Sequence, residues 1–377
     1  MDVNQKLPLL GGLSPAAFMK RHWQKKPLLV RQAWPSVAPP LARAALFALA
    51  GSADVESRLV AREGTGSRAR WRVRNGPLPR RALPPLSRPG WTLLVQGLDL
   101  HVDAAHAMLQ AFRFVPDARL DDLMVSWASA GGGVGPHLDS YDVFLLQVQG
   151  QRRWRIGRAR DTGYVEGAPL KLLQNFEPEE EWLLEPGDML YLPPRWAHDG
   201  VAVGGNCMTC SVGFRAPAAD TLAHDLLQRL GEEEALHTAL YRDARQPATA
   251  TPAALPQTLL DFAQAAVARR LAEPNALARA LGESLTEPKN QVWFELAGRG
   301  YFGAAVALSP RSRMMYDANH IFINGEAFEA AGRDAQIMRR LADDRALGPA
   351  DIARLGADAR ALLDEWIASG WATGVET

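Results

Sequence analysis

Short apolar runs follow one another between about residues 121 and 215 of this 377-residue chain, and Gly, Pro and Asp separate them. Evenly spaced short strands with turn residues between them are typical of a β-sandwich or β-barrel. The pattern therefore predicts a mainly β region here, with a turn at Gly150-Gln151. The expected strands are 123–128, 143–149, 152–156, 181–184, 189–192 and 207–214.

The region before residue 121 mixes short helices and strands. Ser14 is a suitable N-cap for a helix that runs through His22. Apolar strands are expected at 27–30 and 93–95, and proline-rich stretches separate the elements between them.

Apolar residues recur at helical spacing after Pro217. This predicts helices over 218 to about 285, with a loop at 246–256. Beyond residue 290 the pattern is mixed, and its size is compatible with a winged-helix fold. The strands expected there are 292–294, 304–308 and 320–324, and the helices are 334–342, 349–355 and 358–369.

A His-x-Asp motif follows a glycine-rich stretch in segment 131–139, Gly-Gly-Gly-Val-Gly-Pro-His-Leu-Asp. On a strand, His137 and Asp139 project from the same face and can share one ion. His198 follows the strand at 189–192 and supplies a third ligand. Two histidines and one carboxylate that leave coordination positions open are typical of non-haem Fe(II) oxygenases. Alternatively, both histidines are ordinary polar loop residues.

A second His-x-Asp, His101-Val102-Asp103, lies where an amphipathic helix is expected to begin. It has neither a strand nor a glycine-rich turn around it, so we do not expect it to bind metal. The two cysteines, Cys207 and Cys210, fall three apart on an expected strand and therefore on opposite faces. We expect buried thiols rather than a metal or redox pair.

Arg152 is predicted to lie on the apolar face of its strand, together with Trp154 and Ile156. A buried cation is unfavourable unless an anion pairs with it. A dicarboxylic co-substrate would provide that anion, as would an internal Asp or Glu. Thr209 and Ser211 share one face of a later strand, where a hydroxyl could bond the carboxylate or merely fill space.

The composition is that of an ordinary globular protein, with 47% hydrophobic and 22% charged residues. The 42 basic and 42 acidic residues cancel, so net charge indicates neither a nucleic-acid nor a membrane partner. We found no run near the roughly 20 apolar residues of a membrane span and no secretory signal. A cytoplasmic protein is expected.

These motifs resemble the JmjC-type oxygenases of the cupin superfamily. More closely, segments 131–139, 141–144, 150–154 and 211–217 resemble the bacterial ribosomal oxygenases, which hydroxylate an arginine of large-subunit ribosomal protein sixteen. The resemblance implies a double-stranded β-helix, a helical dimerisation region and a C-terminal winged-helix-like domain. The expected bounds are 1–217, 218–288 and 289–377.

The resemblance also implies the roles of individual residues. His137, Asp139 and His198 match the iron ligands and Arg152 the basic residue for 2-oxoglutarate, with dioxygen as the other co-substrate. Ser211 is favoured over Thr209 as the supporting hydroxyl. Tyr141 and Asp199 have suitable chemistry for the substrate guanidinium. A homodimer, a ribosomal protein substrate and no direct nucleic-acid contact are expected.

Three other functions stay open on the sequence. Another JmjC activity, either N-methyl-lysine demethylation or hydroxylation of a different protein, would use the same triad. A cupin that binds metal without oxidation is the second. The third is a winged-helix nucleic-acid regulator, which would need a basic recognition helix, whereas the C-terminal segments are mixed in charge.

Overall fold

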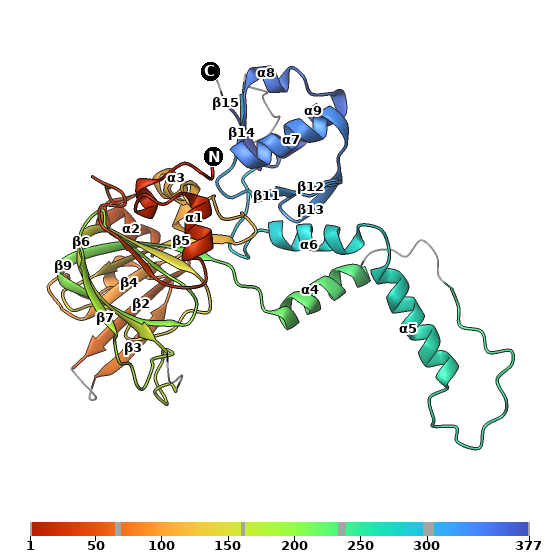
Figure 1. The fold of residues 1–377 in the computed structure, drawn as a ribbon, viewed down its shortest axis with the longest axis horizontal. Helices are drawn as coiled ribbons and strands as arrows, with labels where there is room; N and C mark the ends of the chain where they lie inside the picture. The colour runs from red at the N-terminus through yellow and green to blue at the C-terminus, as the bar shows by residue number, and fades with distance from the viewer. Residues whose placement is uncertain (1, 65–68, 160–162, 233–238, 297–304, 376–377) are drawn as a thin grey trace. The chain divides into compact units, whose positions relative to one another are not determined.

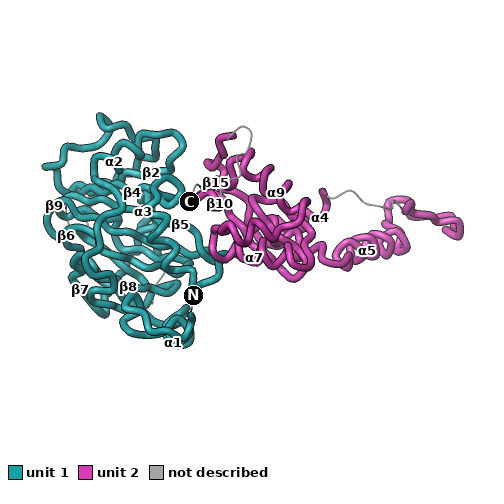
Figure 2. The backbone as a smooth tube through the Cα atoms, turned by 90° about the horizontal axis from the view of Figure 1, so that it is seen from above, with its two compact units in different colours: residues 1–216 teal, residues 217–377 magenta. Residues whose placement is uncertain are grey.

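The structure is a computed structural model that describes residues 2–64, 69–159, 163–232, 239–296 and 305–375. It divides into two compact units, Met1–Ala216 and Pro217–Thr377 (Figure 2). We call them unit 1 and unit 2. The predicted boundary at 288 between a helical region and a terminal domain stays a prediction.

Unit 1 is built on one nine-stranded antiparallel sheet with the order β1-β8-β6-β9-β5-β4-β2-β3, and β7 also pairs with β6 (Figure 1). The strands are β1 (Leu28–Val30), β2 (Ser57–Glu63), β3 (Arg70–Asn75), β4 (Trp91–Val95), β5 (Leu120–Ala128), β6 (Val143–Arg158), β7 (Glu180–Leu184), β8 (Met189–Leu192) and β9 (Trp196–Phe214). The mainly β fold expected from the sequence is confirmed.

The two long strands β6 and β9 run beside each other through the centre of the sheet. The turn predicted at Gly150-Gln151 is wrong, because β6 continues from Val143 to Arg158. Its pairing with β9 shifts register between Gln147 and Gln151, and Gly150 has a φ of +65°. A bulge of this kind bends a strand without ending it, so the signature of a turn here marks a bend.

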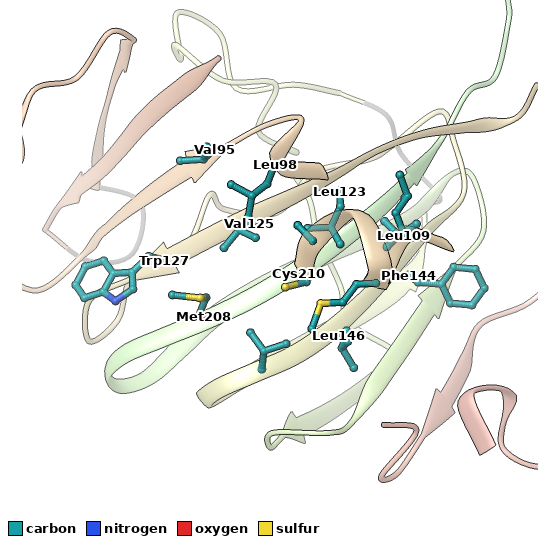
Figure 3. Close-up of a cluster of buried hydrophobic side chains, with 14 of the residues drawn as sticks. Val95, Leu98, Leu109, Leu123, Val125, Trp127, Phe144, Leu146, Met208 and Cys210 are labelled. Atoms are coloured by element: carbon teal, nitrogen blue, oxygen red, sulfur yellow. The ribbon is translucent and has the colours of Figure 1, made fainter. Parts of the chain in front are cut away.

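Two clusters of apolar side chains lie on opposite faces of β6. Phe144, Leu146 and Val148 join the large cluster drawn in Figure 3, with β5 and the following strands. Val143 and Leu145 join a smaller cluster with Trp154 and Ile156. Alternation along β6 therefore separates an outer core from an apolar interior.

Three helices contribute to the outer core, namely α1 (Pro15–Arg21), α2 (Arg43–Leu49) and α3 (Asp103–Gln110). The hydroxyl of Ser14 caps α1 by accepting from the Ala17 amide at 3.2 Å, which confirms the predicted start. Phe18 of α1 is fully buried and contacts Phe144 and Tyr191. The helices thus cover the face of the sheet that points away from the smaller cluster.

Unit 2 begins with α4 (Ala219–Glu232), α5 (Gln257–Leu271) and α6 (Ala276–Thr286) and confirms the predicted loop at 246–256. It ends in a module of small sheets and helices with its own buried core. The module contains β10 (Ala305–Leu308), β11 (Met314–Tyr316), β12 (His320–Ile323), β13 (Glu326–Glu329), α7 (Gly332–Asp344), β14 (Ala346–Leu347), α8 (Pro349–Ile352), α9 (Ala357–Ala368) and β15 (Ala372–Val375). The strand predicted at 292–294 is wrong, since those residues are irregular.

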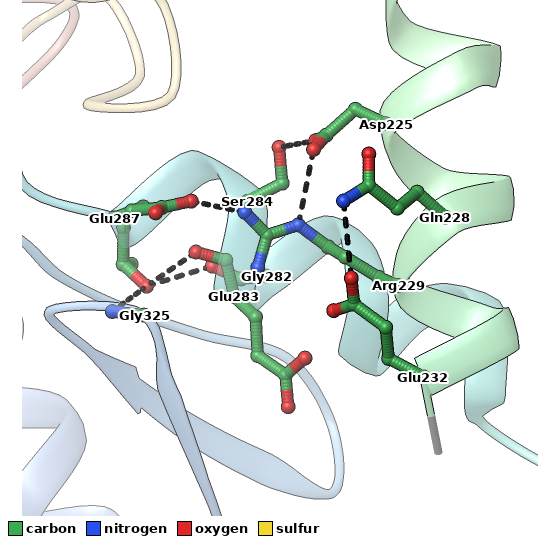
Figure 4. Close-up of polar contacts among 10 residues, drawn as sticks. Asp225, Gln228, Arg229, Glu232, Gly282, Glu283, Ser284, Glu287 and Gly325 are labelled. Carbon is green, nitrogen blue, oxygen red and sulfur yellow. Dashed lines mark hydrogen bonds and ion pairs between the residues drawn. The ribbon is translucent and has the colours of Figure 1, made fainter.

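Polar contacts tie α4 and the terminal module to α6 (Figure 4). Arg229 of α4 pairs with Asp225 at 3.2 Å and with Glu287, which follows α6. The Gly325 amide donates to the Thr286 hydroxyl at 3.1 Å. A Cβ at Gly282 would meet the Phe322 ring at 2.4 Å, so α6 packs directly on β12. No helix in the described part of the chain is long and apolar enough to cross a membrane.

Candidate metal and co-substrate site

The structure brings the three predicted metal ligands together inside unit 1. His137 and His198 form an antiparallel bridge in which each backbone amide donates to the other residue's carbonyl at 3.0 Å. The carbonyl of Asp139 accepts from the Arg195 amide at 2.9 Å. Two segments about sixty residues apart in the sequence are thereby held in register by backbone hydrogen bonds at the ligands themselves.

Glycine is required where the ligand-bearing segment approaches its neighbours. A Cβ at Gly133 would lie 2.5 Å from the Gly200 carbonyl oxygen. Gly135 has a φ of +81°, and a Cβ there would lie 2.5 Å from Leu172 and 3.0 Å from Trp71. The glycine-rich stretch thus lets His137 reach β9.

The ligand atoms of the three side chains all lie within 4.8 Å of one another. The Nδ1 atoms of His137 and His198 lie 2.9 Å from the carbonyl oxygens of Gly135 and Trp196. A carbonyl oxygen only accepts, so each Nδ1 carries the proton and each Nε2 keeps a lone pair. The Nε2 of His198 lies 3.5 Å from Oδ2 of Asp139. Both imidazoles are therefore prepared for a metal ion.

Electrostatics favours the metal-binding form of His198. Burial, and then the neighbouring His137, lower the pKa of His198 to about 4, although Asp139 acts in the opposite direction. The ring is therefore neutral near pH 7, as coordination requires. Within the described ranges, no other set of three His, Cys, Asp or Glu side chains converges in this way, and the His101-x-Asp103 motif is not part of one.

Arg152 lies on the interior face of β6, as predicted, and is only 3% exposed. Its carbon Cζ lies 5.7 Å from the Trp154 ring centroid, and that ring is 5.8 Å from the ring of His198. Within the part of the chain that the structure describes, its buried Nε and Nη2 have no hydrogen-bond partner and no carboxylate pairs with it. This orphaned guanidinium on the same interior face as His198 fits an anionic co-substrate and leaves the internal salt bridge without support.

The two candidate hydroxyls on β9 differ in their partners. Thr209 donates to Oε1 of Gln147 at 2.8 Å and is 1% exposed. Ser211 is 7% exposed and lies opposite Leu145 of β6. Because the Thr209 hydroxyl already has an internal partner, Ser211 stays the preferred candidate for donating to a ligand.

Tyr141 is near the metal ligands, whereas Asp199 points away from them. Burial, together with the Asp139 and Asp122 carboxylates, raises the pKa of the Tyr141 phenol, which also hydrogen-bonds Asp139. Asp199 follows His198 on β9 and pairs with Arg155. Adjacent residues on a strand face opposite sides. This pairing argues against Asp199 as a substrate contact.

Asp122 is an acidic residue that the sequence reading missed, and it lies close enough to the Tyr141 phenol to raise its pKa. It lies on β5, is 8% exposed, and accepts from the Gly97 amide at 2.8 Å. Its alternation with Met124 and Ser126 places these three residues on one face, a signal that was available in the sequence.

The fold and the site together define a class. An antiparallel β-sheet domain that holds two histidines and a carboxylate, with an unpaired buried arginine nearby, is typical of the non-haem metal-dependent oxygenases. In agreement, residues 107–222 match the JmjC domain family and residues 269–373 match the ROXA-like winged helix family.

Comparison with known proteins narrows this class. The ribosomal protein uL16 3-hydroxylase of Escherichia coli is 35% identical over 73% of this chain and 72% of its own length. A probable ribosomal oxygenase of Haemophilus influenzae is 30% identical over 96% of both chains. The structure of Escherichia coli YcfD, a ribosomal oxygenase, in complex with cobalt and 2-oxoglutarate superimposes with a TM-score of 0.78, 30% identity, and coverage of 94% of this chain and 96% of that one. The chain belongs to the bacterial JmjC ribosomal oxygenase family.

Proposed function

We propose that this protein is an Fe(II)- and 2-oxoglutarate-dependent oxygenase that hydroxylates an arginine of ribosomal protein uL16. The observation that carries the proposal is the convergence of His137, Asp139 and His198 beside the unpaired Arg152. The named activity of the Escherichia coli relative supplies the substrate. We propose that the protein acts in the cytoplasm, where ribosomal proteins are made.

The three ligands would hold Fe(II) through two Nε2 atoms and one carboxylate oxygen. Iron bound there supplies dioxygen activation coupled to the oxidative decarboxylation of 2-oxoglutarate to succinate and CO2. The protein's part is to bind, orient and exclude water. The carbonyls of Gly135 and Trp196 fix both imidazole tautomers. A ligand set fixed in this way loses little freedom when the metal binds.

Arg152 would pair with the distal carboxylate of 2-oxoglutarate, and the Ser211 hydroxyl would donate a further hydrogen bond to it. Because Arg152 is buried, a charge-assisted pair there is stronger than it would be in water. Trp154, between Arg152 and His198, belongs to the smaller apolar cluster with Leu145 and Leu190. This apolar wall would keep water from the reacting groups.

Tyr141 would contact the substrate arginine. Tyr141 is 40% exposed, so a protein substrate can reach it. The Asp139 and Asp122 carboxylates lie close enough to raise the pKa of its phenol. A guanidinium is attracted to an aromatic face and to nearby carboxylates. The local charge therefore suits a cationic side chain.

The test is turnover with labelled 2-oxoglutarate, Fe(II) and purified uL16. Succinate formation coupled to a gain of one oxygen on an arginine-containing peptide supports the proposal. Formaldehyde release from a methylated peptide, without a stable oxygen gain, would assign demethylation instead. If the protein binds the metal but forms no succinate, it is a metal-binding cupin without oxidative activity.

We further propose that the protein is a homodimer in which α5 lies at the interface. None of the side chains of α5 is buried, although several are apolar. Leu260, Val267 and Leu271 are 45%, 57% and 44% exposed and are seven and four residues apart, which puts them on one helix face. Sedimentation of Val267→Asp should show a monomer if this stripe is the interface, and an unchanged mass would exclude it.

A further inference from the structure

Arginine is concentrated in one segment of unit 1. Residues 57–90 contain nine arginines and no lysine, with Glu63 as the one acidic residue. Arg68 lies outside the described residues. The chain as a whole has 42 basic and 42 acidic residues, so this local excess is hidden in its net charge. At physiological salt the Debye length is about 8 Å, so a bound ligand interacts with the local excess of positive charge rather than with the net charge of the chain.

The edge strand β3 displays three of these arginines in a row. Arg70, Arg72 and Arg74 are exposed and alternate with the partly buried Trp71 and Val73. Residues two apart on a strand share a face and are separated by roughly 6.6–6.8 Å. The three arginines are therefore evenly spaced along β3, which is the outermost strand of the sheet (Figure 1).

Contacts connect this row to the arginines of the following loop. Arg72 and Arg88 both pair with Glu63, at 3.5 and 2.7 Å, with 70% and 48% of their side chains exposed. Arg74 donates to the Ala82 carbonyl at 3.1 Å, beside Arg80 and Arg81. We define the arginine surface by six exposed residues: Arg70, Arg72, Arg74, Arg80, Arg81 and Arg88.

The arginine surface adjoins the ligand-bearing segment through the other face of β3. A Cβ at Gly135 would lie 3.0 Å from the Trp71 ring, and Gly135 is two residues before His137. Arg62 of β2 lies over the same ring, with Cζ 5.9 Å from its centroid. A polyanion held on the outer face of β3 would therefore lie beside the proposed active site.

We propose that the arginine surface binds the phosphate backbone of RNA. Guanidinium groups form bidentate hydrogen bonds with phosphate, and the surface is made of arginine without lysine. The choice of RNA among polyanions rests on the proposed function, because a ribosomal protein substrate occurs with ribosomal RNA. The net charge of zero gives no hint of this surface, and the proposal departs from the expectation of no direct nucleic-acid contact.

The test is binding of a labelled single-stranded oligoribonucleotide, measured by fluorescence anisotropy across a salt series. The variant is Arg70→Gln/Arg72→Gln/Arg74→Gln. The matched control, Arg242→Gln/Arg245→Gln/Arg354→Gln, changes the charge equally at exposed positions of unit 2. Each lost phosphate contact reduces the log–log salt slope by ~0.7, so the variant's slope should fall by about 2. We expect at least tenfold weaker binding for the variant and less than twofold for the control.

An unchanged slope and affinity in the β3 variant, or an equal loss in the control, would overturn the proposal. Charged residues on an edge strand also prevent pairing with other chains, and that role alone predicts aggregation of the variant without a change in RNA affinity. Binding to phosphatidylserine vesicles that depends on the three arginines, in the absence of RNA binding, would assign a membrane surface instead.

A lysine variant and a turnover assay complete the design. Arg70→Lys/Arg72→Lys/Arg74→Lys should keep the salt slope and lose part of the affinity, because charge stays while the bidentate geometry is lost. The glutamine variant should keep wild-type turnover on isolated uL16. If the wild type and all variants bind RNA as expected but none turns over uL16, only the proposed function is defeated. If the wild type turns over uL16 but does not bind RNA, only this inference is defeated.

Discussion

Replacement of Arg152 by methionine should change co-substrate binding and protein stability in opposite directions. Arg152 is a buried cation whose Nε and Nη2 lack hydrogen-bond partners among the described residues. In the apoprotein it is unfavourable, and with 2-oxoglutarate bound it would be satisfied. Methionine fills most of the same volume without the charge.

The magnitudes follow from these two states. Loss of one partner of a buried charge pair costs about 3–5 kcal/mol, so the dissociation constant for 2-oxoglutarate should rise roughly a hundred- to a few-thousand-fold. Removal of an unsatisfied buried polar group should raise the free energy of unfolding of the apoprotein by about 1–3 kcal/mol. The lost contact with the Trp154 ring offsets part of this gain.

Anaerobic calorimetry with Fe(II) measures 2-oxoglutarate binding without turnover, and denaturant unfolding of the apoprotein measures stability. Arg153→Met is the matched control. Arg153 is the next residue on the strand, and its side chain is 52% exposed on the opposite face. Unchanged 2-oxoglutarate affinity would mean that another residue holds the distal carboxylate. A marked loss of apoprotein stability would make Arg152 a structural residue.

Three further predictions concern the metal ligands, a strained residue and a buried carboxylate. His137→Ala should abolish succinate formation while the circular dichroism spectrum stays that of the folded protein, because the ligand is lost and the fold is not. Arg195→Gly should raise the free energy of unfolding by about 1 kcal/mol in urea titrations, because a φ of +66° is unfavourable for a residue with a Cβ. Asp188→Asn should lower it by roughly 2–3 kcal/mol at neutral pH, because the carboxylate accepts from two backbone amides and Arg31.

The Asp188 prediction has a definite pH dependence. Burial opposes ionisation, but the hydrogen bonds from the Gln32 and Glu185 amides and from Arg31 hold the pKa of Asp188 below its usual value. A lowered folded-state pKa stabilises the protein above the unfolded pKa of about 3.9, and this contribution is lost as pH falls through the folded value. The difference between wild type and Asp188→Asn should shrink below about pH 4. A difference that stays constant in acid would contradict the assignment.

Two comparisons check the other predictions. Arg195→Ala keeps a Cβ and should bring no stabilisation, so an equal gain in both variants would exclude backbone strain as the cause. Succinate formation at the wild-type rate in purified His137→Ala would defeat the triad assignment. Both outcomes are measurable on the full chain.

Local sequence rules worked where the signal was local. The Ser14 cap, the strand at 189–192 and the alternation that buries Arg152 follow from side-chain chemistry within a few residues. The rules failed at Gly150, where a turn and a bulge share the same glycine signal. Only pairing with β9 decides between them, because the partner strand continues past the bend.

The sequence by itself determined the ligand types and their spacing: a histidine and an aspartate two apart, a distant histidine, and an arginine on an apolar face. Tertiary structure decided which of these side chains lie close together and which already have a hydrogen-bond or ion-pair partner. It paired the backbones of His137 and His198, turned Asp199 toward Arg155, and brought six arginines of one segment into a single surface. The reason is that contacts between segments depend on strand register and face, which no stretch of the sequence specifies alone.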